Sequence, residues 1–280
     1  AHHPGGHKYN RGHVLVLSGG VGRGGAARME ARAALRVGAG LVTLGCPAAA
    51  LQENAARLDA VMLLAVSDAE ALAALLADRR LSCVALGPGL GVGARTRDLV
   101  GAACAAGEGI GPRRRVVVDA DALTSFTEDP ETLFALVHPL CVLTPHEGEF
   151  ARLFPDLAIT ARAGAGLSKV DAARRAADRA GCTVLLKGPD TVIASPGGGA
   201  SIHAASYDRA APWLGTAGAG DVLAGLIAGL LAPDTLGDSP HPAVEAAAWL
   251  HVEAARSFGP GLIAEDLPEE LPRVFRALGL

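Results

Sequence analysis

The chain alternates short apolar segments with longer Ala-rich segments of helical period, and this pattern continues over nearly all of its 280 residues. Most of the short segments carry apolar residues at consecutive positions, as strands buried on both faces do. Because each pair of parallel strands needs a crossover connection, usually a helix, such alternation favours a mostly parallel sheet with helices on both faces. The sequence therefore predicts an α/β fold with three layers: helix, sheet and helix.

The individual elements follow from this pattern and from the Gly and Pro residues between them. The predicted strands cover residues 13–18, 40–45, 61–64, 81–86, 116–119, 140–143 and 182–186. The predicted helices cover residues 26–37, 48–56, 68–77, 95–106, 147–153, 168–180, 219–231 and 242–258. Two further β-prone pieces, 191–194 and 201–204, flank a Pro-Gly-Gly-Gly turn and predict a small hairpin at one sheet edge. No break in composition resembles a linker, so we expect residues 1–280 to form a single domain.

Charge and composition exclude some partners. Acidic and basic residues are mixed and the formal net charge is −4, so no basic stripe is available to neutralise the phosphates of a nucleic acid. The dense basic cluster at residues 113–115 precedes an apolar run and predicts a solvated strand entrance. The longest apolar stretch, residues 222–232, is well short of the roughly 20 residues of a membrane span and predicts a buried helix. We expect no nucleic-acid and no membrane partner.

The cysteines indicate the compartment. They are five in number, widely spaced and inside or beside apolar segments, which is typical of small buried hydrophobes. The chain opens Ala-His-His-Pro-Gly-Gly and shows no signal-peptide pattern. We therefore expect the reducing cytoplasm.

The strongest local signal is the turn Gly215-Thr216-Ala217-Gly218-Ala219-Gly220-Asp221, which runs directly into the apolar helix at residues 219–231. Small residues let backbone N–H groups approach an anion, and the helix that follows adds its positive end, so the turn predicts a phosphate site. A carboxylate there would repel a bound phosphate unless it had a task such as taking a proton from an attacking hydroxyl. Asp221 is our candidate base. The alternative is that Asp221 only caps the helix.

Other glycine turns follow predicted strands. They are Gly87-Pro88-Gly89-Leu90-Gly91 and the segment from Ser18 to Gly25. Neither fits a dinucleotide-binding G-x-G-x-x-G fingerprint or a P-loop, and each singly is explained by a tight turn. Because ligands of open α/β sheets collect beyond the carboxyl ends of the strands, the coincidence of these turns predicts one shared crevice.

Polar residues follow three more predicted strands. Asp119 and Asp121, with Glu149, are candidates to hold Mg²⁺ through water rather than directly, although Asp121 also suits a helix cap. His146 is placed to donate a hydrogen bond to a substrate, with an incidental turn residue as the alternative. Lys187, within Lys187-Gly188-Pro189-Asp190-Thr191, offers a cation to a nucleotide phosphate, and a plain hairpin turn is the alternative.

Together these segments resemble the ADP- or ATP-dependent NAD(P)H-hydrate dehydratases, a ribokinase-like family, over nearly the whole chain. The segments that carry the resemblance are His7-Lys8 with residues 12–20, residues 25–29, residues 33–43, residues 87–91, residues 119–123, residues 144–146 with 148–149, Lys187-Gly188, and residues 218–225. Their order and spacing are far more specific than any one motif. The resemblance implies a ribokinase-like α/β/α sandwich.

The resemblance also implies an activity, the repair of the S-form of hydrated NADH or NADPH. Asp221 would deprotonate the ring hydroxyl, which attacks the terminal phosphate of ADP or ATP, and elimination of phosphate would restore the dihydropyridine. The implied substrate contacts are Ala26, Gly89, Gly91, His146 and Asp221. The implied nucleotide contacts are Lys187, Gly188, Pro189, Asp190, Thr191, Ala217, Gly218, Ala219 and Gly220. The implied cofactors are Mg²⁺ and a phosphoryl donor, for which ADP is preferred here.

The chain departs from the family pattern at three places. Ala219 stands where Ser is usual, and Glu147 stands where Pro follows the His. In the nucleotide loop, Pro189 removes one backbone N–H and Asp190 adds negative charge near phosphate. The family further implies a homotetramer and a separate epimerase partner, since we expect no fused epimerase domain.

Two other functions remain open on the sequence. A small-molecule kinase of the same superfamily, of the hydroxyethylthiazole or hydroxymethylpyrimidine type, would share the fold and the Gly-x-Gly-Asp base. His146 favours the dehydratase, because thiazole kinases carry Asn there. A nucleotide-binding regulatory module without turnover would gain nothing from Asp221.

Overall fold

The structure is a computed structural model that describes residues 8–105, 114–158, 167–233, 237 and 239–280. His7 of the opening motif, Ala106 at the end of a predicted helix and Arg113 of the basic cluster lie outside the described residues. The strands are β1 (His13–Leu17), β2 (Leu41–Cys46), β3 (Met62–Ala65), β4 (Cys83–Leu86), β5 (Arg115–Val118), β6 (Cys141–Leu143), β7 (Thr183–Leu186), β8 (Asp190–Ala194) and β9 (Ala200–Ala204). Each of the strands predicted from the sequence is confirmed, with ends that differ by one or two residues.

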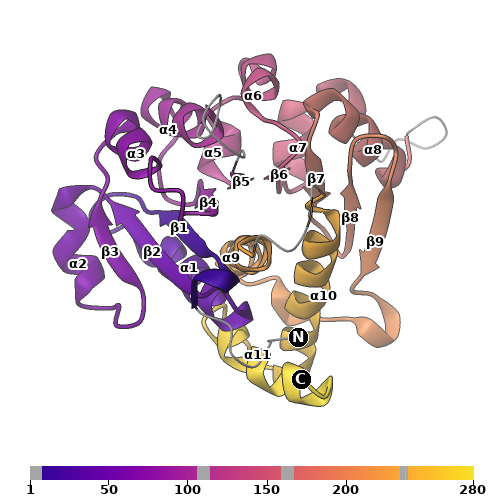
Figure 1. Cartoon of the computed structure of the whole chain (residues 1–280). Coiled ribbons are helices and arrows are strands. Elements are labelled where there is room, and N and C mark those ends of the chain that lie inside the picture. The colour runs from indigo at the N-terminus through magenta and orange to yellow at the C-terminus, as the bar shows by residue number, and fades with distance from the viewer. Residues whose placement is uncertain (1–7, 106–113, 159–166, 234–236, 238) are drawn as a thin grey trace.

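The strands of the described residues form one sheet in the order β3-β2-β1-β4-β5-β6-β7-β8-β9 (Figure 1). Strands β1 to β7 are parallel, and β8 and β9 pair antiparallel at the edge, as the predicted hairpin requires. The order reverses at β1, since β2 and β3 lie on one side of it and β4 on the other. This is a switch point, where open α/β sheets bind their ligands.

The helices are α1 (Gly25–Val37), α2 (Leu51–Ala55), α3 (Ala69–Leu75), α4 (Ala94–Ala105), α5 (Asp121–Thr124), α6 (Pro130–Leu136), α7 (Glu147–Leu153), α8 (Lys169–Ala180), α9 (Ala219–Leu231), α10 (His241–Phe258) and α11 (Asp266–Ala277). Short 3₁₀ turns lie at Lys8–Arg11, Ala48–Ala50, Pro155–Leu157, Tyr207–Arg209 and Pro212–Leu214. The sequence reasoning missed α5, α6 and α11. Pro272 lies inside α11 and removes one helical hydrogen bond, but Leu267, Leu271 and Val274 of this helix are buried against the core and hold it in place.

Two buried clusters separate the three predicted layers. Alternate residues of one strand point to opposite faces, so Val14 and Val16 of β1 join one cluster while Leu15 and Leu17 join the other. The first cluster packs under α1, α9, α10 and α11, and the second under α3 to α8. Figure 1 shows these two groups of helices on opposite sides of the sheet. All five cysteines are buried free thiols, which confirms the prediction that they act as small hydrophobes.

Helices α1 and α9 pack in unusually close contact at the centre of one face. A Cβ placed on Gly225 would lie 2.2 Å from the Glu30 carbonyl oxygen, and one on Gly229 would lie 2.6 Å from that of Ala34. The contacts follow the same order along both helices, so the helices run parallel with their N-termini on the same side. Glycine at these two positions lets the first turn of α9 lie beside the first turn of α1.

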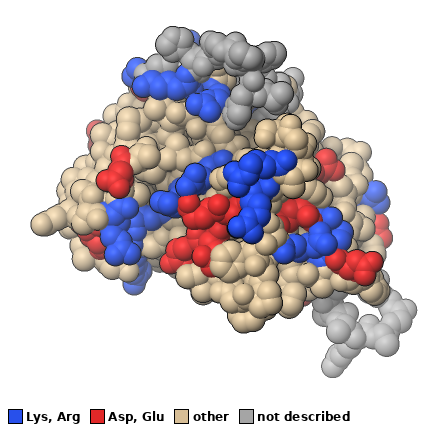
Figure 2. All heavy atoms as spheres, turned by 90° about the horizontal axis from the view of Figure 1, so that it is seen from below, with Lys and Arg blue, Asp and Glu red and all other residues tan. Residues whose placement is uncertain are grey.

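The molecular surface mixes charges, and one surface prediction needs correcting. On the face shown in Figure 2, basic and acidic side chains lie next to one another. The predicted solvated strand entrance is wrong for Arg114, which is buried and donates hydrogen bonds to the carbonyls of Leu81 at 2.6 Å and Asp78 at 3.1 Å. Its guanidinium satisfies carbonyls that precede β4, a tertiary demand that the sequence does not reveal. No helix of the described residues is long and apolar enough to cross a membrane.

Candidate active site

The predicted site residues follow neighbouring strands at one edge of the sheet. Asp119 comes directly after β5, His146 three residues after β6, and Lys187 directly after β7. Because β5, β6 and β7 are adjacent and parallel, their carboxyl ends bring these residues together. Lys187 N–H also donates to the Pro145 carbonyl at 2.9 Å, which ties the two neighbouring strand ends to each other.

The glycine turns after β1 and β4 contact each other at the same edge. A Cβ placed on Gly19 would lie 1.9 Å from the Gly89 carbonyl oxygen, and Gly89 itself has φ of +74°. Gly91 N–H donates to the Asp121 carboxylate at 2.9 Å, so Asp121 holds this turn and does not cap α5, whose N-cap is Ala120. These contacts place Gly89 and Gly91 beside the acidic strand end. Ala26 is half-buried in the first turn of α1.

The predicted phosphate turn forms the start of α9. Gly218 is the N-cap residue with φ of +92°, and a Cβ there would lie 2.6 Å from Met29 Cε. No side chain caps this helix, and Asp221 lies inside its first turn. The alternative that Asp221 only caps the helix is therefore wrong. The uncapped N–H groups are suited to an anion.

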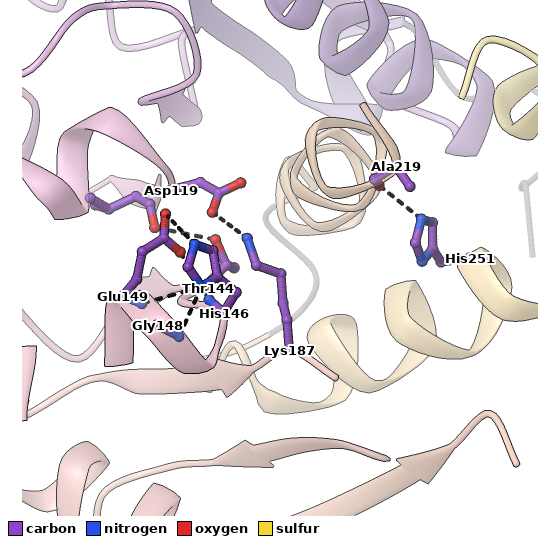
Figure 3. Close-up of polar contacts among 9 residues, drawn as sticks. Asp119, Thr144, His146, Gly148, Glu149, Lys187, Ala219 and His251 are labelled. Atoms are coloured by element: carbon purple, nitrogen blue, oxygen red, sulfur yellow. Dashed lines mark hydrogen bonds and ion pairs between the residues drawn. The ribbon is translucent and has the colours of Figure 1, made fainter. Parts of the chain in front are cut away.

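Lys187 joins this turn to the strand ends (Figure 3). Its Nζ forms an ion pair with Asp119 Oδ1 at 2.7 Å, and a Cβ placed on Gly220 would lie 3.7 Å from the same Nζ. Burial alone would lower the pKa of Lys187, but Asp119, with Glu149 and Asp221 at longer range, raises that pKa above its ordinary value. Lys187 therefore stays a cation beside the start of α9.

Asp221 is electrostatically disfavoured as an anion. Burial first, and then the Asp119 and Asp121 carboxylates, raise the pKa of its carboxyl to about 6, with Lys187 opposing them. At neutral pH most of the carboxylate is still ionised, with a pKa suited to a general base. The geometry thus places a proton acceptor beside an ammonium group and an uncapped helix start.

His146 is the N-cap of α7 rather than an incidental turn residue. Its Nδ1 accepts hydrogen bonds from the N–H groups of Gly148 at 2.9 Å and Glu149 at 3.2 Å, while Glu149 accepts one from the His146 N–H at 2.9 Å (Figure 3). Because Nδ1 accepts, the neutral ring carries its proton on Nε2. The ring is exposed and its Nε2 lies 3.5 Å from Glu149 Oε1, so donation of this N–H to a substrate remains a prediction.

The segment Lys187-Gly188-Pro189-Asp190-Thr191 is the turn between β7 and β8, so the hairpin alternative describes its geometry correctly. Thr191 Oγ1 donates to the Gly188 carbonyl at 3.0 Å, and the Pro189 carbonyl accepts from Ala205 N–H at 2.7 Å. Asp190 forms an ion pair with Lys169 at 3.1 Å. The turn is therefore fixed by its own contacts, and a nucleotide role remains a prediction.

The carboxylates proposed for magnesium are not gathered into one cluster. Asp119 pairs with Lys187, Asp121 with Gly91, and Glu149 with the His146 backbone. Within the described residues, no three His, Cys, Asp or Glu side chains form a group that could hold a metal ion. Asp119 and Asp121 nevertheless both act on the pKa of Asp221. Contact of these carboxylates with Mg²⁺ through water therefore remains a prediction.

Sequence reasoning missed two residues beneath the start of α9. Glu30 of α1 is buried, and in the described part of the chain neither of its carboxyl oxygens has a hydrogen-bond partner. Burial first, then Asp221 and Asp119, raises its pKa well above the ordinary value. His251 of α10 donates from Nε2 to the Ala219 carbonyl at 2.9 Å and so holds the first turn of α9 (Figure 3). The sequence does carry a signal for Glu30, because this charged residue lies on the apolar face of its helix with Ala27, Ala31 and Ala34.

Comparison with known proteins identifies the family. The family model for NAD(P)H-hydrate dehydratase matches residues 14–273. The chain belongs to the NAD(P)H-hydrate dehydratase family. An ADP-dependent (S)-NAD(P)H-hydrate dehydratase from Xanthomonas campestris is 31% identical over 98% of this chain and 92% of its own length. Membership confirms the resemblance seen in the sequence and favours a dehydratase over a small-molecule kinase.

Bifunctional and structurally characterised relatives extend the comparison. The bifunctional NAD(P)H-hydrate repair enzyme of Gloeobacter violaceus is 38% identical over 89% of this chain but only 45% of its own length. The chain thus spans about half the length of such relatives. The ADP/ATP-dependent NAD(P)H-hydrate dehydratase of Bacillus subtilis, crystallised with ATP and Mg²⁺, superposes with a TM-score of 0.77 at 26% identity over 99% of this chain and 93% of that one. A ribokinase-like superfamily protein of Enterococcus faecalis, at 24% identity and a TM-score of 0.79 over 99% and 91% of the two chains, has the same fold.

Proposed function

We propose that this chain uses ADP, or ATP, to dehydrate the S-form of hydrated NADH or NADPH, with Asp221 as the base. The observation that carries the proposal is the position of Asp221, a carboxylate with a pKa of about 6 in the first turn of α9, beside Lys187. Family membership supports the substrate class.

The proposed reaction has two stages. Asp221 takes the proton of the ring hydroxyl as that oxygen attacks the terminal phosphorus of the nucleotide, and the shortened nucleotide leaves. The ring nitrogen then donates its lone pair to expel phosphate from the adjacent carbon, and loss of a ring proton restores the dihydropyridine. Each turnover consumes one terminal phosphoryl group and releases inorganic phosphate.

One group of the proposed site residues binds the nucleotide, and another group binds the hydrate. Lys187 to Thr191 and the backbone from Ala217 to Gly220 hold the nucleotide phosphates, where Lys187 and the start of α9 stabilise negative charge. The hydrate lies against Ala26, Gly89 and Gly91 and accepts a hydrogen bond from His146 Nε2. Asp119, Asp121 and Glu149 would hold Mg²⁺ through water, and the ion would neutralise charge on the nucleotide phosphates.

Three further properties belong to the same proposal. ADP is the preferred donor, in keeping with the name of the Xanthomonas relative. The protein works in the reducing cytoplasm, a compartment supported by its five buried free thiols. It acts as a homotetramer and works together with an NAD(P)H-hydrate epimerase.

The test is to incubate the purified chain with Mg²⁺, acid-hydrated NADH and ADP or ATP, and to follow the return of dihydronicotinamide absorbance. We expect a return that requires nucleotide, and we expect Asp221→Asn to abolish it while ADP still binds. Near-normal turnover by Asp221→Asn would show that the base is misassigned. Consumption of nucleotide with a thiazole or pyrimidine alcohol but no return of absorbance would instead favour the kinase.

A further inference from the structure

Lys169 is the basic residue at the nucleotide turn that the proposed reaction does not use. The chain has only three lysines among its 25 basic side chains, and two of them, Lys169 and Lys187, meet at this turn. Lys169 begins α8, and its side chain is only 10% exposed. Its ammonium group is thus held in place, unlike a typical surface lysine.

The Lys169 ammonium group uses all of its donors on the turn and its surroundings. It lies 3.1 Å from Asp190 Oδ1, 3.2 Å from Glu147 Oε1 and 3.4 Å from the Lys187 carbonyl oxygen. An ammonium group has three N–H donors, so these three acceptors occupy it fully. A Cβ placed on Gly188 would lie 2.4 Å from Lys169 Nζ, so the ammonium group lies directly against the backbone of the turn.

The three acceptors connect the start of α7, the end of β7 and the start of β8. Asp190 in the turn and Glu147 at the start of α7 are two acidic residues at which this chain departs from the family pattern. Without a cation, their charges would repel nucleotide phosphates and one another. Lys187, by contrast, contacts the carboxylate of Asp119 and lies next to Gly220, which leaves it able to reach a phosphate.

We propose that Lys169 is a positioning residue that neutralises Asp190 and Glu147 and fixes the Lys187–Thr191 turn in its phosphate-binding shape, without itself contacting the nucleotide. The proposal rests on the proposed nucleotide site at this turn. It assigns distinct tasks to the two lysines: Lys187 binds phosphate and Lys169 holds the loop. It also explains how the loop tolerates Asp190.

The experiment measures the affinity of the full chain for ADP with Mg²⁺ by titration calorimetry. Lys169→Met keeps the buried apolar stem and removes the charge. We expect it to weaken ADP binding by about 5- to 20-fold at low salt, since it disconnects two partly exposed ion pairs and a backbone contact. In the hydrate assay the KM for ADP should rise while the KM for the hydrate stays within about twofold. Lys169→Arg should retain most of the affinity, and Arg175→Ala, an exposed position on the same helix, should leave it unchanged.

The second arm removes the charge that Lys169 neutralises. In the double variant Lys169→Met with Asp190→Asn, ADP binding should recover by at least severalfold relative to Lys169→Met alone. Equal affinity of Lys169→Met and the natural chain would overturn the proposal, as would an equal loss in Arg175→Ala or no recovery in the double variant. If the hydrate is not dehydrated but ADP binding still depends on Lys169, the proposed reaction fails and this inference stands.

Discussion

Asp221 is held where losing its proton is harder than in water. Burial and two neighbouring carboxylates stabilise its neutral form, and the Lys187 ammonium partly compensates. A base with an ordinary carboxyl pKa would be ionised at neutral pH but would hold a captured proton weakly. A pKa closer to the working pH makes the Asp221 carboxylate a stronger base, while most of it stays ionised at neutral pH.

The pH dependence of turnover follows from this shift. Asp221 must be ionised to accept a proton, so kcat/KM should rise with pH, reach half of its maximum near pH 6 and level off above that. The check is a pH–rate profile for hydrate dehydration with the ADP affinity measured over the same pH range, because nucleotide phosphates also titrate there. A midpoint near pH 4, the ordinary value of a carboxyl, would contradict the role of the Asp221 environment.

Glu30 is the second carboxyl that the fold stabilises in its neutral form, and we predict that it limits stability at high pH. Its folded pKa is raised well above 4.5, so its contribution to stability is complete below that value and is lost as pH rises towards the folded pKa. Glu30→Gln cannot ionise and escapes this loss. We expect the melting temperature of Glu30→Gln to rise relative to that of the natural chain by a few degrees as the pH goes from 5 to 8.5. Thermal unfolding at several pH values measures this difference. Glu128→Gln, an exposed control, should show no such trend, and an equal trend in both variants would refute the assignment.

The pairing of α1 with α9 is the element on which the site depends. Gly225 and Gly229 bring the helices into backbone contact, Gly218 fits against Met29, and His251 holds the Ala219 carbonyl. Together these contacts fix the direction of the first turn of α9. Gly218, which the sequence offered as an anion-site residue, also packs against Met29, whereas Gly225 and Gly229 serve close packing below the site.

Substitutions at two glycines of α9 test the packing role and the anion-binding role separately. Gly225→Ala should destabilise the fold by about 1–3 kcal/mol, because the new Cβ would lie 2.2 Å from the Glu30 carbonyl and overpacking exceeds the gain in helix propensity. Gly220→Ala should leave stability unchanged or slightly raised, since its Cβ meets only Lys187 Nζ at 3.7 Å, yet it should raise the KM for nucleotide by narrowing the anion site. Denaturant unfolding and steady-state kinetics measure the two effects. A stable Gly225→Ala variant would contradict the packing role of Gly225. A Gly220→Ala variant with unaltered nucleotide KM would contradict the role of Gly220 at the anion site.

At the scale of the whole molecule, sheet order explains why distant segments meet. The chain places β1 between β2 and β4, so the segments after β1, β4, β5, β6 and β7 meet at one edge of the sheet, where Lys187 lies next to Gly220 of α9. Continuity of the sheet from β3 to β9 supports our proposal that residues 1–280 form one domain.

Local patterns were enough to determine much of this arrangement. Consecutive apolar residues marked the buried strands, helical periodicity marked most helices, and glycine turns marked the strand ends, because each of these signals acts between residues close in the chain. The same logic proposed Asp221, His146 and Lys187 as site residues. It missed α11, which contains Pro272 and is held in place by tertiary burial.

Only the tertiary structure decided which groups share an environment. It placed Lys187 against Asp119, 68 residues away, and Glu30 beneath Asp221, and it assigned Lys169 to the acidic residues of the nucleotide turn. The physical reason is that burial, pKa and ion pairing depend on neighbours in space. The sequence determined which chemical groups were available, and packing determined their protonation and their partners.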